Sequence, residues 1–134
     1  MNKRILEDTQ NSLSVIDKAE KIQKKAASVG FDWQNSDHII KKIEEELNEV
    51  REAIICGNNQ DDLFSEIGDL IFSCINLARY YKINPEITLH NANNKFIKRF
   101  NYIEDELTKK NISISDASLE EMDRLWDESK TNTT

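Results

Sequence analysis

Residues 61–81 read DDLFSEIGDLIFSCINLARYY, and the order of polar and apolar residues in this stretch decides the fold class. Drawn as a helix, the stretch is apolar over most of its circumference, which is typical of a buried helix. Its polar residues recur at helical spacing along one narrow stripe: Asp62, Glu66, Asp69, Ser73, Asn76 and Tyr80. We therefore predict a largely buried helix over residues 61–83, with the carboxylates of Glu66 and Asp69 partly buried in its polar strip.

Two helices are predicted before this one. The first covers residues 4–29, where apolar residues recur every three or four positions, and Gly30 follows as a C-cap. The second begins after an N-cap at Ser36 or Asp37 and ends at Cys56.

Two more helices are predicted after it. Asn84 caps a helix over residues 85–109, whose first position is a proline, as is common at helix starts. A capping box formed by Ser118 and Glu121 begins a short last helix.

These elements predict an all-α fold: an antiparallel helical bundle of four main helices plus a short C-terminal helix. A chain of 134 residues suits one domain, here residues 1–130, and the polar tail 131–134 is predicted to be disordered. The nearly all-round apolar third helix also favours a homodimer, because a bundle of this size has little room to bury it alone.

Composition excludes several classes of protein. A formal net charge of −7 argues against a nucleic-acid binder, whose affinity rests on basic patches. No run of apolar residues is long enough to span a membrane, and the first ten residues contain no apolar signal core, so a cytoplasmic location is expected. Cys56 and Cys74 have no metal-ligand spacing and are predicted to be reduced core residues. His38 and His90 are predicted to lie on the surface.

Residues 42–54 read KIEEELNEVREAI, with five glutamates, a composition that is usually a solvated helix face. At about 100° per residue, Glu45 and Glu52 lie roughly opposite the apolar stripe of the helix. Glu46 and Glu49 instead lie along the edge of that stripe. The run is therefore interpreted as two sets of carboxylates with different surroundings.

The short turn between the second and third helices predicts antiparallel neighbours. Their facing edges would then gather four carboxylates: Glu46, Glu49, Glu66 and Asp69. Like charges this close either take up protons or bind cations, and oxygen-only ligands favour hard ions such as Mg²⁺ or Mn²⁺. The alternative is a set of structural salt bridges to Lys42, Lys95 or Arg99.

Several motifs carry a resemblance to a known family. FDW at 31–33, EEELNEV at 44–50 and EIGDL at 66–70 resemble the MazG-like nucleoside triphosphate pyrophosphohydrolases. NLARYY at 76–81, ANNKFIKRF at 92–100 and MDRLWDESK at 122–130 extend the resemblance over most of the chain. One acidic motif alone is weak, whereas the ordered series with these spacings is specific.

The resemblance implies an all-α, typically dimeric enzyme that uses Mg²⁺, with Mn²⁺ as a possible substitute. It implies hydrolysis of (deoxy)nucleoside triphosphates to the monophosphate and pyrophosphate. The role expected for this activity is nucleotide-pool sanitising. It implies four catalytic, metal-binding positions: Glu46, Glu49, Glu66 and Asp69. It also implies five substrate-binding positions: Asn93, Lys95, Arg99, Trp126 and Lys130. Phe31 and Trp33 are candidates for stacking on a base, with core packing as the alternative.

The mechanism predicted on this basis is attack by water on the α-phosphorus, with Glu49 as the preferred general base. A ferritin-like di-iron bundle is disfavoured because neither histidine has a glutamate three residues before it. The remaining alternative is a non-enzymatic acidic helical dimerisation module, which predicts no magnesium dependence.

Overall fold

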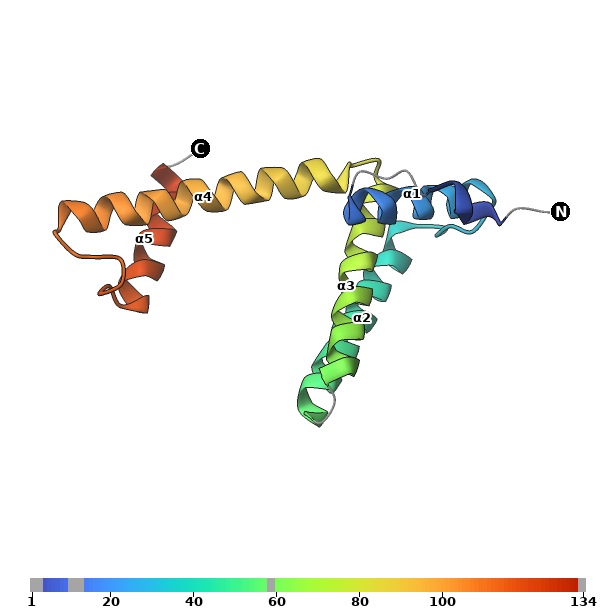
Figure 1. Cartoon of the computed structure of the whole chain (residues 1–134), viewed down its shortest axis with the longest axis horizontal. Helices are drawn as coiled ribbons and strands as arrows, with labels where there is room; N and C mark the ends of the chain where they lie inside the picture. Colours follow the sequence, from blue (N-terminus) through green and yellow to red (C-terminus); the bar gives the residue numbers. More distant parts are fainter. Residues whose placement is uncertain (1–3, 10–13, 58–59, 133–134) are drawn as a thin grey trace. The chain divides into compact units, whose positions relative to one another are not determined.

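The computed structural model describes residues 4–9, 14–57 and 60–132 (Figure 1). Within these residues the regular secondary structure is entirely helical, which confirms the predicted all-α class. A 3-10 turn, η1, precedes five α-helices: η1 (Ile5–Thr9), α1 (Val15–Ser28), α2 (Ser36–Cys56), α3 (Gln60–Tyr80), α4 (Pro85–Lys109) and α5 (Leu119–Asn132).

The chain divides into two compact units, Met1–Glu86 and Ile87–Thr134. In the first unit, α2 and α3 run antiparallel along each other, and α1 packs against α3 (Figure 1). In the second unit, α5 packs back on α4 through a small apolar core of Ile103, Leu107 and Leu125. A single domain containing one four-helix bundle stays a prediction.

The first helix is shorter than predicted. Ser14 is its N-cap: the Oγ atom accepts a hydrogen bond from the Asp17 backbone N–H at 3.0 Å, so α1 begins at Val15. Ile5–Thr9 form a separate 3-10 turn. The prediction of one continuous helix from residue 4 is therefore wrong for this turn, and residues 10–13 lie outside the described part of the chain.

The second helix begins one residue earlier than the predicted caps allow. Asn35 is the N-cap, because its Oδ1 accepts from the His38 backbone N–H at 3.2 Å, and Ser36 is already helical. At the other end, Gly57 has a φ of 64°, a left-handed conformation that glycine adopts without a Cβ clash.

The third helix ends at Tyr80 rather than near residue 83, and the fourth begins at Pro85 as predicted. Asn84 Oδ1 accepts from the Glu86 backbone N–H at 2.9 Å, which satisfies one of the free donors at the start of α4.

The last helix begins as predicted, since Ser118 Oγ accepts from the Glu121 backbone N–H at 3.1 Å. It continues through Asn132, so the predicted disorder is wrong for Thr131 and Asn132. The last two residues of the chain lie outside the described part.

The prediction that α3 is buried on most sides is wrong for the isolated chain. Phe64 is 81% exposed and Ile71 is 54% exposed. The physical reason is that, among the described helices of the first unit, α3 contacts only α1 and α2. Cys56 and Cys74 are exposed free thiols rather than core residues, whereas His38 and His90 lie on the surface as predicted. No helix in the described ranges has both the length and the apolar character needed to span a membrane.

Candidate metal centre and adjoining cavity

Three of the four predicted carboxylates meet between α2 and α3. Glu46, Glu66 and Asp69 each offer one oxygen, and these oxygens lie within 4.8 Å of one another. Glu46 comes from α2 and is 8% exposed, whereas Glu66 and Asp69 stand one turn apart on the polar stripe of α3. The antiparallel packing of two helices thus brings together residues that are separated by about twenty positions in the sequence.

Glu49 lies outside this group of three and is exposed, but its charge acts on the site. The pKa of Glu66 is raised by desolvation and then by the negative charges of Glu49, Asp69 and Glu46. The contributions of these three neighbours are repulsions between like charges, which disfavour the ionised form of Glu66. A cation would relieve that repulsion.

Lys42 supplies part of the compensating charge. Its Nζ lies 3.0 Å from Glu46 Oε1 and 3.9 Å from Glu45 Oε2, and its pKa is raised by the hydrogen bond and charge of Glu46. The structural salt bridge considered as the alternative is therefore present for Lys42. Glu45 has a side chain that is 69% exposed, in agreement with its predicted position on the solvent side.

The donor set suits a hard divalent cation. All three groups are carboxylates, and neither histidine nor cysteine contributes to the group. One ammonium group does not neutralise three carboxylates, so the residues present fit an ion such as Mg²⁺.

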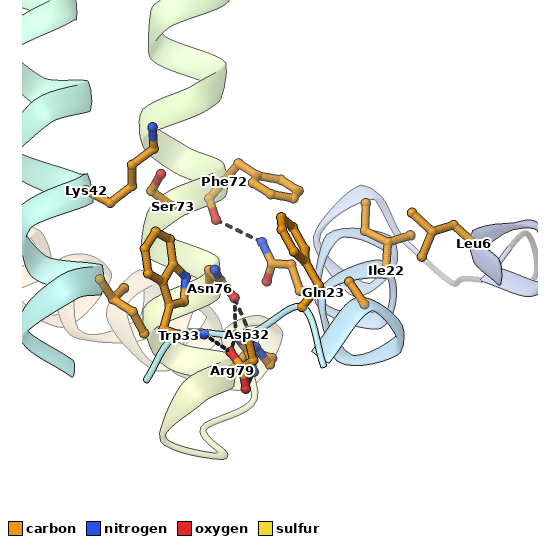
Figure 2. Close-up of a pocket in the computed structure, with 13 residues that line it drawn as sticks. Leu6, Ile22, Gln23, Asp32, Trp33, Lys42, Phe72, Ser73, Asn76 and Arg79 are labelled. Carbon is orange, nitrogen blue, oxygen red and sulfur yellow. Dashed lines mark hydrogen bonds and ion pairs between the residues drawn. The ribbon is translucent and has the colours of Figure 1, made fainter. Parts of the chain in front are cut away.

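The first unit also contains a cavity of about 410 Å³ (Figure 2). Its walls are mainly apolar and aromatic side chains, including Phe31, Trp33 and Phe72. Lys42 lines the cavity while its ammonium group contacts Glu46, and Ser73, which follows Asp69 by one helical turn, also lines it. Lys42 therefore links the cavity to the carboxylate cluster.

A partly buried ion pair holds the segment that carries Trp33. The Arg79 guanidinium donates to both carboxylate oxygens of Asp32, at 2.8 and 3.1 Å, and to Asn76 Oδ1 at 2.6 and 3.0 Å (Figure 2). The hydrogen bond from Arg79 is the main reason why the pKa of Asp32 is lowered. Because Asp32 directly precedes Trp33, this pair fixes the approach of the α1–α2 segment to α3.

Sequence reasoning missed Asp32, Arg79 and Gln23 as cavity residues. One signal was available for Arg79: a lone cation at the end of an otherwise apolar helix needs a partner. Nothing local in the sequence identifies that partner, which lies 47 positions away.

The other five predicted substrate-binding residues belong to the second unit. Asn93 and Lys95 are both exposed. The Arg99 guanidinium lies 5.5 Å from the centre of the Trp126 ring, and its buried Nε has no hydrogen-bond partner within the described residues. Lys130 pairs with Asp127 at 3.6 Å.

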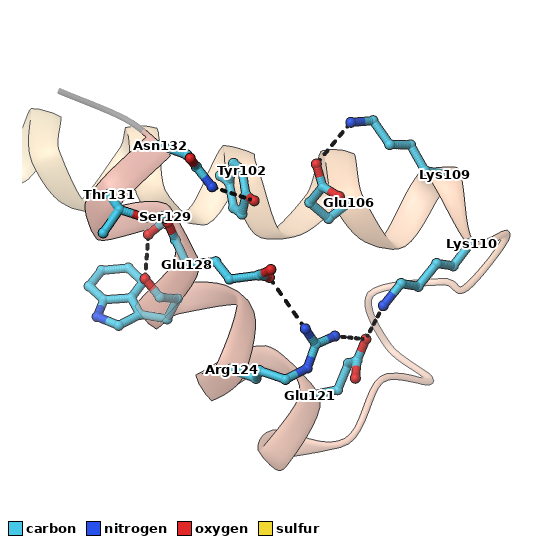
Figure 3. Close-up of polar contacts among 11 residues, drawn as sticks. Tyr102, Glu106, Lys109, Lys110, Glu121, Arg124, Glu128, Ser129, Thr131 and Asn132 are labelled. Atoms are coloured by element: carbon cyan, nitrogen blue, oxygen red, sulfur yellow. Dashed lines mark hydrogen bonds and ion pairs between the residues drawn. The ribbon is translucent and has the colours of Figure 1, made fainter.

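Polar contacts organise the α4–α5 connection of this unit (Figure 3). Glu121 Oε1 accepts from Lys110 Nζ and from the Arg124 guanidinium, both at 2.9 Å, and these bonds lower the pKa of Glu121. The Asn132 amide donates to Tyr102 Oη at 3.1 Å. These contacts hold the last helix, which carries Trp126, against α4.

The described residues form a helical protein in which clustered carboxylates that could hold a metal lie near an apolar cavity, and comparison with known proteins identifies its family. Residues 34–103, just over half of the chain, match the MazG nucleotide pyrophosphohydrolase domain. The chain belongs to the MazG nucleotide pyrophosphohydrolase family.

Three relatives illustrate the match. The chain is 38% identical over 112 residues to the nucleoside triphosphate pyrophosphohydrolase/pyrophosphatase MazG of Thermotoga maritima, covering 84% of this chain and 42% of the relative. It is 37% identical over 129 residues to the nucleoside triphosphate pyrophosphohydrolase of Escherichia coli K12, covering 93% and 48%. It is 44% identical over 72 residues to the uncharacterized protein YabN of Bacillus subtilis, covering 54% and 15%. The chain thus spans about half the length, or less, of the relatives it matches.

Proposed function

We propose that this chain hydrolyses (deoxy)nucleoside triphosphates to the monophosphate and pyrophosphate with Mg²⁺ as cofactor. The observation that carries the proposal is the continuity of two features: three carboxylates within 4.8 Å of one another, and an apolar, aromatic cavity joined to them through Lys42. A triphosphate needs a cation site for its phosphates and an apolar site for its base. The names of the Thermotoga maritima and Escherichia coli relatives agree with this activity.

In the proposed reaction, a water oxygen attacks the α-phosphorus, the bond from that phosphorus to the α–β bridging oxygen breaks, and pyrophosphate leaves. A bound Mg²⁺ would supply the positive charge that neutralises the triphosphate and favours ionisation of the water. Glu46, Glu66 and Asp69 would hold the ion. Glu49, which is exposed beside them, is the proposed acceptor of the water proton.

The cavity would hold the nucleoside. Trp33 and Phe31 present aromatic surface there, and stacking on a base is tolerant of its identity because every base has a flat π face. The family resemblance separately implies phosphate contacts for three cations of the second unit: Lys95, Arg99 and Lys130. Partly buried Arg99 keeps one donor unused, and Asn93 and Trp126 complete the proposed substrate-binding set.

We also propose that the protein works as a homodimer with a role in nucleotide-pool sanitising. Large apolar side chains on α3 support the dimer, since Phe64, Ile67 and Ile71 are 81%, 42% and 54% exposed in the single chain. Apolar surface of this kind is typical of helices that pack against another surface.

The test is an assay of pyrophosphate release from a panel of canonical and modified nucleoside triphosphates with and without Mg²⁺. Wild type is expected to release pyrophosphate only with the metal, and Glu66→Ala and Asp69→Ala are expected to remove activity without loss of helicity. Glu52→Ala is the matched control, because Glu52 is an exposed glutamate of α2 outside the cluster. Absence of pyrophosphate from every triphosphate, or full activity in both variants, would refute the proposal and favour the non-enzymatic module.

A further inference from the structure

One residue that lines the cavity, Gln23, has a buried polar atom with no hydrogen-bond partner among the described residues. Gln23 is 6% exposed, and its Nε2 donates to the Phe72 backbone carbonyl at 3.0 Å. Its Oε1 is buried and accepts no hydrogen bond within the described residues. A buried acceptor without a donor costs free energy that a ligand N–H group would recover.

The orientation of the Gln23 amide is fixed by its surroundings. The Phe72 carbonyl oxygen can only accept, so the nitrogen of Gln23 must face it and the oxygen must take the other position. Rotating the amide by 180° would place two acceptors against each other. Gln23 lines the cavity, and the end of its amide that is left for a further partner is therefore an acceptor, and not a donor.

Asn76 is fixed in the opposite sense. Its Oδ1 accepts two hydrogen bonds from the Arg79 guanidinium, which has only donors, so its Nδ2 is held as the donor end of the amide. Asp32 holds Arg79 in place on the other side. In Figure 2, Asn76 is drawn between Trp33 and Gln23, and all three line the cavity.

We propose that Gln23 is a specificity-determining residue, whose Oε1 accepts a hydrogen bond from an N–H group on the edge of the substrate's base. Asn76 Nδ2 is the neighbouring donor for an acceptor on the same edge, and Arg79 is the residue that positions it. This inference rests on the proposed function, because it assigns the base of the nucleotide to the cavity. It adds a requirement that stacking on Trp33 does not impose: the base must carry an N–H donor.

Calorimetric titration with nucleoside monophosphates tests the requirement without depending on hydrolysis. The probes are AMP, GMP, CMP and UMP, together with purine riboside 5′-monophosphate and 2-pyrimidinone riboside 5′-monophosphate, whose bases have no N–H donor. The comparison is between the canonical monophosphate that binds most tightly and the donor-free analogue of the same ring size. Wild type is expected to bind the canonical monophosphate at least about tenfold more tightly, because the analogue leaves one buried acceptor without a hydrogen bond.

Gln23→Leu is expected to reduce this preference to about twofold or less, with Gln23→Met as a second variant of similar length. Gln60→Leu, on an exposed glutamine of α3, should keep the wild-type ratio. A purely structural role for Gln23 would weaken both ligands equally and leave the ratio unchanged, which would overturn the inference. Equal binding of both ligands by wild type, or no measurable binding of any monophosphate, would also overturn it.

The outcomes separate this inference from the proposed function. Pyrophosphate release by a wild type that shows no preference for donor-bearing bases overturns the inference alone. A preference for donor-bearing monophosphates in a protein that releases no pyrophosphate supports the inference and overturns the hydrolysis.

Discussion

The ion pair between Asp32 and Arg79 gives a sharp prediction about stability. The Arg79 side chain is 8% exposed and that of Asp32 is 32% exposed. Removing one partner of a fully buried pair costs about 3–5 kcal/mol, whereas an exposed pair contributes about 0–1 kcal/mol. Asp32→Asn leaves a buried guanidinium without a counter-charge, although Asn76 still accepts from it. We therefore expect the free energy of unfolding of the first unit to fall by about 2 kcal/mol at pH 7.

The effect should depend on pH in a defined direction. Because Arg79 lowers the pKa of Asp32 in the folded state, the pair contributes fully above the unfolded carboxyl pKa of about 3.9. Its contribution is lost as the pH falls through the lower, folded pKa. The difference between wild type and Asp32→Asn should therefore be constant from about pH 7 to pH 5 and shrink below about pH 4.

Urea unfolding followed by the fluorescence of Trp33 measures this difference. A Trp126→Phe background leaves Trp33 as the single indole, since the chain has two tryptophans. Asp105→Asn, an exposed change in the second unit, is the control and should leave the transition of the first unit unchanged. The reasoning is refuted if Asp32→Asn unfolds within about 0.3 kcal/mol of wild type at pH 7, the range of ordinary surface substitutions.

Three further predictions concern the carboxylate cluster and the small apolar core of the second unit. The pKa of Glu66 is raised in the folded state, so ionisation of this carboxyl destabilises the metal-free protein once the pH exceeds the pKa of Glu66 in the unfolded chain. Glu66→Gln should therefore raise the midpoint temperature of thermal unfolding without metal at pH 7. The same variant should show a smaller increase in that midpoint when Mg²⁺ is added. Lys42→Met removes the cation nearest the cluster and should lower the metal-free midpoint and enlarge the Mg²⁺-induced increase, whereas Lys41→Met, on an exposed neighbour, should do neither. Leu107→Ala should cost the second unit about 2–5 kcal/mol in urea unfolding, because Leu107 is 1% exposed, whereas Leu119→Ala, at 70% exposure, should cost less than about 0.5 kcal/mol. Equal effects within any of these pairs, or no change in the midpoint of Glu66→Gln, would contradict the corresponding argument.

Local patterns predicted the helices well because caps act over three or four residues. Ser118 and Asn84 make the predicted capping bonds, and Asn35 makes one that was assigned to the next residues. Helical spacing also placed Glu46 and Glu66 on facing edges, where the structure brings them together with Asp69.

The sequence could not predict features that depend on distant partners. The apolar circumference of α3 implied burial, but α3 packs on α1 and α2 and leaves Phe64 exposed. Arg79 and Asp32 are paired across 47 positions in the sequence. The orientation of the Gln23 amide depends on a backbone carbonyl group 49 positions away. Such pairs are specified by packing, which has no fixed spacing in the sequence.

Hydrolysis in ¹⁸O-labelled water tests the central claim most directly, because it identifies the phosphorus that is attacked. With wild type, Mg²⁺ and the best substrate of the triphosphate panel, mass spectrometry should find one ¹⁸O atom in the monophosphate and none in the pyrophosphate. Label in the pyrophosphate would place the attack on the β-phosphorus, and release of orthophosphate in place of pyrophosphate would show a different reaction. Either result would contradict the account.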